Sequence, residues 1–166
     1  MKIYIGPYSD TYSDKRDVKI ELDPYDTWGL DHTLALIIHP LLVQLKETTH
    51  GAPYVDDEDV PEHLRSTAAA PKENEWDTDS LHFDRWDWVM GEMIWAFEQH
   101  KSDDEELFQH NLDNLDMKMD GGKVAFSVKD PSKPGYYYDK DGHKRHLERK
   151  SNGRRLFAKY YDGLWD

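Results

Sequence analysis

The sequence predicts a single α+β domain in which two or three long helices pack with a small antiparallel sheet. Three observations predict this class. Two long segments, at about 27–48 and 80–101, carry apolar residues at helical spacing. Two short segments, near the N-terminus and at about 115–128, alternate apolar and polar residues as half-buried strands do. A chain of 166 residues is long enough for one real core, to which 13% aromatic residues contribute bulk.

The N-terminal strands are expected at 2–6 and 17–22, where KIYIG and DVKIEL alternate. The turn-rich stretch 7–16 between them would make a hairpin. The first helix should then begin near Thr27 or Asp31, run to about Thr48 and bend at Pro40. Its inward face is predicted from six aliphatic residues at helical spacing: Leu30, Leu34, Ile37, Ile38, Leu41 and Leu45.

Residues 51–79 predict a long irregular loop, because they hold three prolines, an acidic run and little periodicity. Five apolar residues are candidates to pin this loop across the core: Tyr54, Val55, Val60, Leu64 and Trp76. Loops of this length tend to be either functional or loosely ordered.

The second helix is expected to begin at an N-cap formed by Asp79 or Ser80. Its apolar side chains cover more than half of its circumference, which predicts a helix packed between two partners and leaves room for a homo-oligomer surface. The main stripe consists of Trp86, Met90, Met93 and Phe97, widened by Val89 and Ile94.

The C-terminal part is expected to contain a short acidic helix at 103–112 and a hairpin at 115–128 with an Asp-Gly-Gly turn. Tyrosines 136–138 would form a last strand in a loop. A final helix is predicted to start, or to be interrupted, near Asn152-Gly153. Its inward side chains should be Leu156, Phe157, Tyr160 and Leu164.

Composition narrows the classes of function. The absence of cysteine excludes thiolate catalysis and cysteine-ligated zinc, and it fits a reducing compartment. No apolar run reaches the length of a signal peptide or a membrane span, so a cytoplasmic protein without a membrane partner is expected.

The net charge of −13 is unevenly distributed. Residues 1–117 hold 27 acidic residues against 9 Lys or Arg, whereas residues 118–166 hold 7 against 12. Because an acidic surface repels phosphate backbones, duplex nucleic acid is not expected as a partner. An acidic mimic of nucleic acid is one alternative interpretation.

Candidate site residues begin with Asp31, His32 and His39 on the first helix. The two histidines are seven residues apart and so lie roughly 10 Å apart on one face, too far to ligate one metal directly. A metal-dependent phosphohydrolase would therefore need further ligands, such as His82 and Asp84. The alternatives are that the histidines border the core or that they bind a ligand without a metal.

Aromatic and cationic side chains are abundant, and they could bind a nucleotide-like molecule by stacking and by phosphate contacts. The alternative is that the aromatic side chains simply fill the core. No catalytic motif and no cofactor fingerprint is recognisable, so neither catalytic residues, a metal nor a cofactor is predicted. The ligand pocket is expected beside the first helix, framed by Trp28, Asp31, His32, His39, Arg65 and Arg85.

Four segments carry a resemblance: YDTWGLDHTLALIIHPLLVQLKETTHGAP, VDDEDVPEHLRS, DSLHFDRWDWVMGEMIWAFEQ and GRRLFAKYYDGLWD. They resemble an uncharacterised family of small proteins encoded by tailed bacteriophages, including T4-like and environmental phages. The resemblance covers most of the chain from about residue 23 and implies a viral protein acting in the host cytoplasm. It implies no reaction and no catalytic residues.

The leading hypothesis is a non-enzymatic, host-directed or anti-defence binding protein that sequesters a nucleotide-like signalling molecule or blocks a host protein. A phosphohydrolase using Asp31, His32, His82 and Asp84 is the first alternative. An acidic nucleic-acid mimic is the second.

Overall fold

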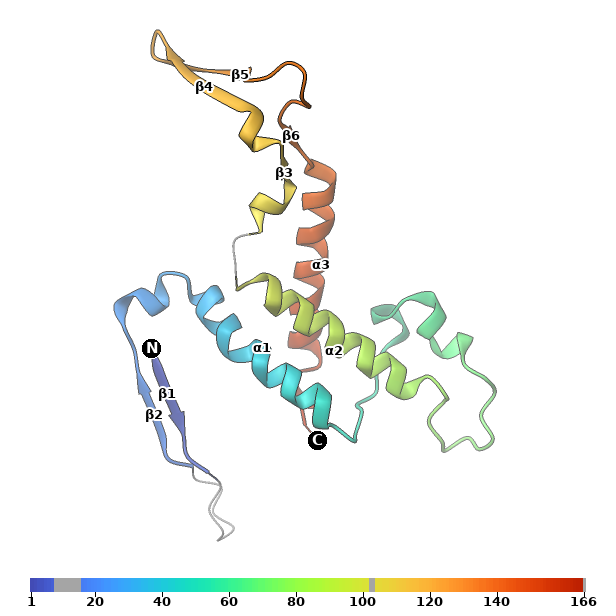
Figure 1. Cartoon of the computed structure of the whole chain (residues 1–166). Helices are drawn as coiled ribbons and strands as arrows, with labels where there is room; N and C mark the ends of the chain where they lie inside the picture. Colours follow the sequence, from blue (N-terminus) through green and yellow to red (C-terminus); the bar gives the residue numbers. More distant parts are fainter. Residues whose placement is uncertain (8–15, 102–103, 166) are drawn as a thin grey trace.

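The computed structural model describes residues 1–7, 16–101 and 104–165 (Figure 1). Three helices form the body: α1 (Leu30–Thr48), α2 (His82–Gln99) and α3 (Lys140–Lys159). Three antiparallel pairs of strands accompany them: β1 (Lys2–Ile5) with β2 (Val18–Glu21), β3 (Gln109–His110) with β6 (Tyr137–Tyr138), and β4 (Leu115–Asp120) with β5 (Lys123–Val128). The predicted α+β class is confirmed.

Short 3₁₀ turns connect these elements. They are η1 (Pro24–Thr27), η2 (Asp57–Asp59), η3 (Glu62–Leu64), η4 (Ser66–Ala68), η5 (Glu105–Phe108), η6 (Leu112–Asn114) and η7 (Tyr161–Gly163). The acidic helix expected at 103–112 is thus a 3₁₀ turn followed by the short strand β3.

Helix α1 has the expected limits, but its buried face differs from the predicted one. Ala35 and Leu42, seven residues apart, are the buried residues, whereas Leu34 and Leu41 are exposed. Apolar residues on α1 cover two overlapping stripes, and only one of them can face α2. Spacing alone cannot tell which stripe is used, so the predicted inward set was partly wrong.

Helix α2 lies between α1 and α3 and provides more of the core residues than any other element. The predicted stripe is confirmed: Trp86, Met90, Met93 and Phe97 are all buried, and so is Val89. The helix begins at His82, later than expected, although Asp79 still accepts a hydrogen bond from the Leu81 amide at 2.9 Å. Helices α1 and α3 both pack against α2 within the chain, while Phe83 on α2 remains 59% exposed.

Helix α3 is continuous through Asn152 and Gly153, so the predicted interruption or start at this position was wrong. Gly153 is buried against α2, and a Cβ there would lie 2.5 Å from the carbonyl oxygen of Glu92. The glycine therefore permits close approach of two helices and does not end one. Leu156 and Tyr160 are buried on the same face, as expected.

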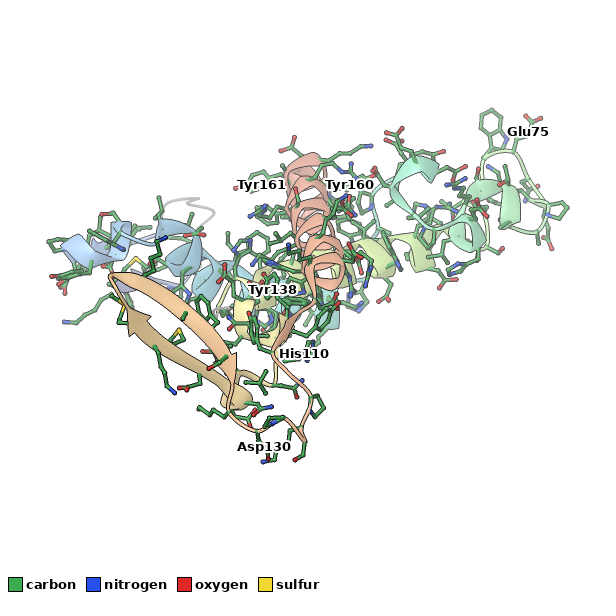
Figure 2. All side chains as sticks on the ribbon, turned by 90° about the horizontal axis from the view of Figure 1, so that it is seen from above. Glu75, His110, Asp130, Tyr138, Tyr160 and Tyr161 are labelled. Atoms are coloured by element: carbon green, nitrogen blue, oxygen red, sulfur yellow. The ribbon has the colours of Figure 1, made fainter. Side chains whose placement is uncertain are left out.

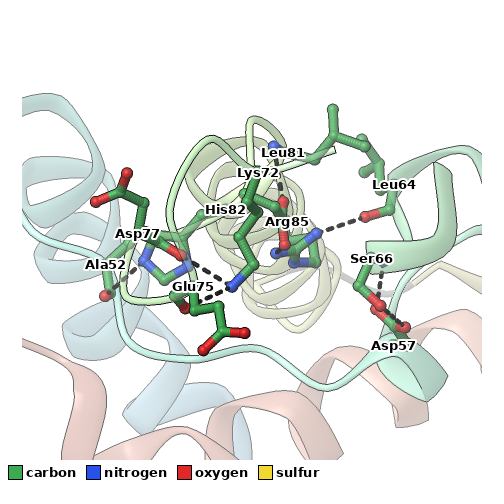
Figure 3. Close-up of polar contacts among 11 residues, drawn as sticks. Ala52, Asp57, Leu64, Ser66, Lys72, Glu75, Asp77, Leu81, His82 and Arg85 are labelled. Atoms are coloured by element: carbon green, nitrogen blue, oxygen red, sulfur yellow. Dashed lines mark hydrogen bonds and ion pairs between the residues drawn. The ribbon is translucent and has the colours of Figure 1, made fainter. Parts of the chain in front are cut away.

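The loop 51–79 has no α-helix or strand, but its contacts fix it to the start of α2 (Figure 3). The buried Arg85 guanidinium donates to the carbonyl oxygen of Leu64 at 3.1 Å. Asp57 accepts hydrogen bonds from the backbone amide of Ser66, at 2.7 Å, and from its hydroxyl. Of the predicted anchors, Val55 and Val60 are buried and Leu64 is half-buried, whereas Tyr54 and Trp76 are exposed.

Two hairpins project from the helices (Figure 1). The β4–β5 hairpin turns at Gly121 and Gly122, whose φ angles of 57° and 82° favour glycine, as the Asp-Gly-Gly motif predicts. All residues of β1, β2 and β5 are exposed. Residues 8–15 of the predicted N-terminal turn lie outside the described residues.

Candidate functional site

Four of the six predicted ligand-binding residues lie just before α1 or between its start and its middle. Trp28 is 90% exposed and precedes the helix. His32 Nδ1 lies 3.1 Å from the carbonyl oxygen of His100, at the end of α2. An Asp31 carboxylate oxygen is 3.9 Å from His100 Nδ1, and His39 Nε2 lies 2.6 Å from a carboxylate oxygen of Glu98. Both histidines thus join α1 to the end of α2.

The other two predicted residues, Arg65 and Arg85, lie at the opposite end of α2. Arg85 pairs with Asp79 at 2.6 Å beneath the loop 51–79. Arg85 and His100 are separated by fifteen positions, or roughly 22 Å along a helix. The six residues therefore do not surround one common pocket, because helix pairing places them near different ends of α2.

The four residues of the phosphohydrolase alternative are also divided between the two ends of α2. His82 Nε2 lies 3.2 Å from the carbonyl oxygen of Ala52 at the start of α2, whereas His32 is held by His100 at its end. Eighteen positions of helix correspond to roughly 27 Å. One metal ion therefore cannot be bound by all four residues predicted for the phosphohydrolase: Asp31, His32, His82 and Asp84. That predicted set of ligands was wrong.

Among the described residues, one group of acidic side chains has oxygens close enough for a metal ion: Asp56, Glu58 and Asp59 lie within 4.8 Å of one another. The ammonium of Lys159 already lies among them, at 2.8 Å from Asp56, 3.2 Å from Glu58 and 2.5 Å from Asp59. Lys159 thus supplies the positive charge that compensates the carboxylates, and the group joins the loop 51–79 to α3.

Asp59 is the buried centre of this group. Its carboxylate accepts a hydrogen bond from the Tyr160 hydroxyl at 2.6 Å and pairs with Arg155 at 2.6 Å. Burial by itself would raise the pKa of Asp59, but the hydrogen bonds from Lys159, Tyr160 and Arg155 outweigh it and hold the pKa below its ordinary value. Burial, and then the bond to Asp59, raises the pKa of Tyr160 to about 12.

A second buried carboxylate, Asp104, fixes the segment after α2 to α3. One of its oxygens lies 2.7 Å from His146 Nε2 and 2.6 Å from Lys150 Nζ. Burial would raise the pKa of Asp104, but the bonds from Lys150 and His146 hold it below its ordinary value. Its oxygen thus already has two partners on α3.

Some of the aromatic and cationic side chains that could hold a nucleotide contact other side chains within the fold. The Arg149 guanidinium lies 4.0 Å from the centre of the Trp95 ring. It also forms a two-bond pair with Glu92, at 2.7 Å and 3.0 Å. These contacts join α2 to α3, so Arg149 and Trp95 already have structural partners.

The fold leaves an apolar groove open between α1 and the C-terminal segment. Its volume is about 470 Å³. Leu41 and Tyr161 form its outer rim and are 64% and 63% exposed. Figure 2 shows Tyr160 and Tyr161 on opposite sides of the end of α3, so that Tyr160 serves the Asp59 group while Tyr161 serves the groove. The lining residues are Ile38, Leu41, Leu42, Leu45, Phe157, Tyr161 and Leu164.

The helical spacing of the apolar residues predicts most of the lining residues as core and does not single out Tyr161. The available signal was the surplus of apolar positions on 27–48, which is more than one helix face can bury. Comparison with known proteins adds nothing to this picture, because scans of protein-family models, curated proteins and solved structures each found no match. Among the described helices, none is long and apolar enough to cross a membrane.

Proposed function

We propose that this chain is a non-enzymatic binding protein, of the host-directed phage class that its sequence resembles, and that it captures an amphipathic helix of another protein. The observation that carries the proposal is the apolar groove beside α1, with Leu41 and Tyr161 exposed at its rim. Large apolar side chains that line an open groove are a common feature of protein interaction sites.

The dimensions of the groove support a helix as its occupant. Ile38 and Leu45 both line it, and seven residues of helix span roughly 10 Å. A partner helix offers anchor side chains over a comparable length when they are spaced at i, i+4 and i+7. Phe157 and Leu164 form the opposite wall, so such anchors would be held between two apolar surfaces.

Charge defines the polar face of the partner. One wall of the groove, on α1, belongs to the acidic first 117 residues, whereas the other wall belongs to residues 118–166, which hold 7 acidic residues against 12 Lys or Arg. Two exposed carboxylates lie next to the groove along the chain. Glu47 is two residues after Leu45, and Asp162 directly follows Tyr161. Because these two exposed carboxylates flank the groove, a helix with basic residues on its polar face would be attracted to them, and an acidic one repelled.

Fluorescence anisotropy with two labelled synthetic helices tests this function. Both peptides carry leucines at i, i+4 and i+7, and their remaining positions are mainly lysine in one peptide and glutamate in the other. We expect saturable binding of the lysine peptide alone, weakened about tenfold or more by Leu41→Arg, which places a charge in the groove. Leu36→Arg is the matched control, since Leu36 is an exposed leucine of the same helix that does not line the groove.

The result also separates the alternatives. Binding that disappears in high salt but is equally strong in wild type and Leu41→Arg would favour the acidic mimic. Failure of the lysine peptide to bind, or equal loss in both arginine variants, would contradict a helix-binding groove.

A further inference from the structure

The β4–β5 hairpin has one wholly apolar face. Its register pairs Leu115 with Val128, Met117 with Phe126 and Met119 with Val124. Residues that pair directly point to the same side of a sheet, and alternate residues along a strand share that side. All six apolar side chains therefore lie on one face, while Asp116, Lys118, Ala125 and Ser127 belong to the other.

This apolar face is exposed. Met117, Met119 and Phe126 are 64%, 73% and 63% exposed, and Val124 and Val128 are also exposed. Figure 1 shows the hairpin extending away from the three helices beyond one end of α3. Strict alternation is the pattern of strands with one buried face, yet the helices do not cover this one.

The base of the hairpin is firmly built. Asn114 is buried, and its side-chain amide donates to the carbonyl oxygens of Pro134 at 2.9 Å and Asp130 at 3.2 Å. Its side-chain oxygen accepts the Asp130 amide at 2.9 Å, and its carbonyl oxygen accepts the Lys129 amide at 3.0 Å. These bonds fix both ends of the hairpin, so its projection follows from specific contacts.

We propose that two copies of the chain form a homodimer by packing the apolar faces of their β4–β5 hairpins against each other. An isolated two-stranded hairpin is only marginally stable in water, and a second hairpin would supply the missing layer at the usual sheet spacing of about 10 Å. Each copy offers on the order of 500 Å² of apolar surface, so the pair would bury roughly 1,000 Å² in total, close to the smallest specific interfaces.

Charge favours a second copy as the occupant. Residues 115–128 contain two aspartates and two lysines, so the hairpin is neutral although the whole chain carries −13. Two identical neutral faces can meet without repulsion, and a two-fold axis makes such a face complementary to itself. A strongly basic or acidic partner would find no attraction on this hairpin.

Sedimentation of the full chain over a range of micromolar concentrations tests the dimer. The chain has a mass of 19.6 kDa, and we expect the wild type to reach twice that mass. The double variant Met117→Lys and Phe126→Lys should raise the dimer dissociation constant at least about tenfold, because it buries charge between the hairpins. Ala125→Lys with Ser127→Lys adds the same charge on the polar face and should dimerise as the wild type does.

Cross-linking provides a second measurement that does not depend on affinity alone. The chain has no cysteine, so a single Phe126→Cys substitution introduces one reactive thiol near the centre of the apolar face. A short bis-maleimide should join two copies through this position, whereas Ser127→Cys on the polar face should stay largely unlinked. A wild type that remains monomeric at every concentration, or equal effects of the two lysine pairs, would overturn the dimer.

Discussion

The helical bundle and the β4–β5 hairpin use apolar residues in opposite ways. In the bundle, Val89, Met93 and Leu156 are completely buried at the contacts of α2 with its two neighbours. In the hairpin, Met119 and Phe126 are largely exposed, although the alternation of the strands is as regular as the stripe of α2. Periodicity therefore marks a face suited to burial without showing which molecule will bury it.

The largest expected difference between the bundle and the hairpin is in how much the free energy of unfolding falls when an apolar side chain is removed. Leu156→Ala should lower the free energy of unfolding by about 3 kcal/mol, because it leaves a cavity in the fully buried core. Met119→Ala should change it by less than about 0.5 kcal/mol in the monomer. Urea unfolding at a protein concentration too low for dimer formation measures both changes. Similar losses of stability in the two variants would contradict the contrast between bundle and hairpin.

Gly153 tests how closely α2 and α3 pack within the bundle. Gly153→Ala should lower the free energy of unfolding by about 2 kcal/mol, because the new methyl group would meet the backbone of α2 and the helices would have to separate. Ser151→Ala is the control, since Ser151 is exposed on the same helix. A neutral Gly153→Ala variant would show that α2 and α3 do not approach as closely as described.

The buried pair of Asp59 and Tyr160 should have a smaller, pH-dependent effect on the free energy of unfolding. The pKa of Asp59 is lowered in the folded chain, so its contribution to stability is present above its unfolded pKa of about 4 and is lost as the pH falls further. The pKa of Tyr160 is raised to about 12, so its contribution is present below its unfolded pKa and is lost as the pH rises from about 10.

Unfolding free energies of wild type and Tyr160→Phe, measured from acidic to alkaline pH, check this dependence. Tyr160→Phe should remove part of the alkaline loss and leave much of the acidic loss, since Asp59 keeps its bonds to Lys159 and Arg155. An alkaline loss of the same size in both proteins would argue against the proposed role of the Tyr160 hydroxyl.

Much of the fold was predictable because some patterns have one physical solution. The Asp-Gly-Gly turn and its flanking alternation define the β4–β5 hairpin, and the wide stripe of α2 requires two neighbours. The inward face of α1 was not predictable, because two stripes compete for a single partner helix. The predicted interruption or start at Gly153 was wrong because a glycine serves a helix terminus and a close helix contact equally well.

The site was less predictable than the fold. His32, His39 and Arg85 are unusual in an apolar context, and their chemistry suggested a shared pocket. The structure gives each of them its own partner: His100, Glu98 and Asp79. The groove consists of ordinary apolar residues, and only the tertiary arrangement shows which of them remain exposed.

The most direct test of the central claim, that exposed apolar surface of this chain serves binding and not folding, is to measure stability and binding on the same Leu41→Arg protein. We expect an unfolding midpoint within error of the wild type, together with about tenfold or greater loss of affinity for the lysine-rich helix. A marked fall in the unfolding midpoint, with unchanged affinity in the protein that remains folded, would contradict it.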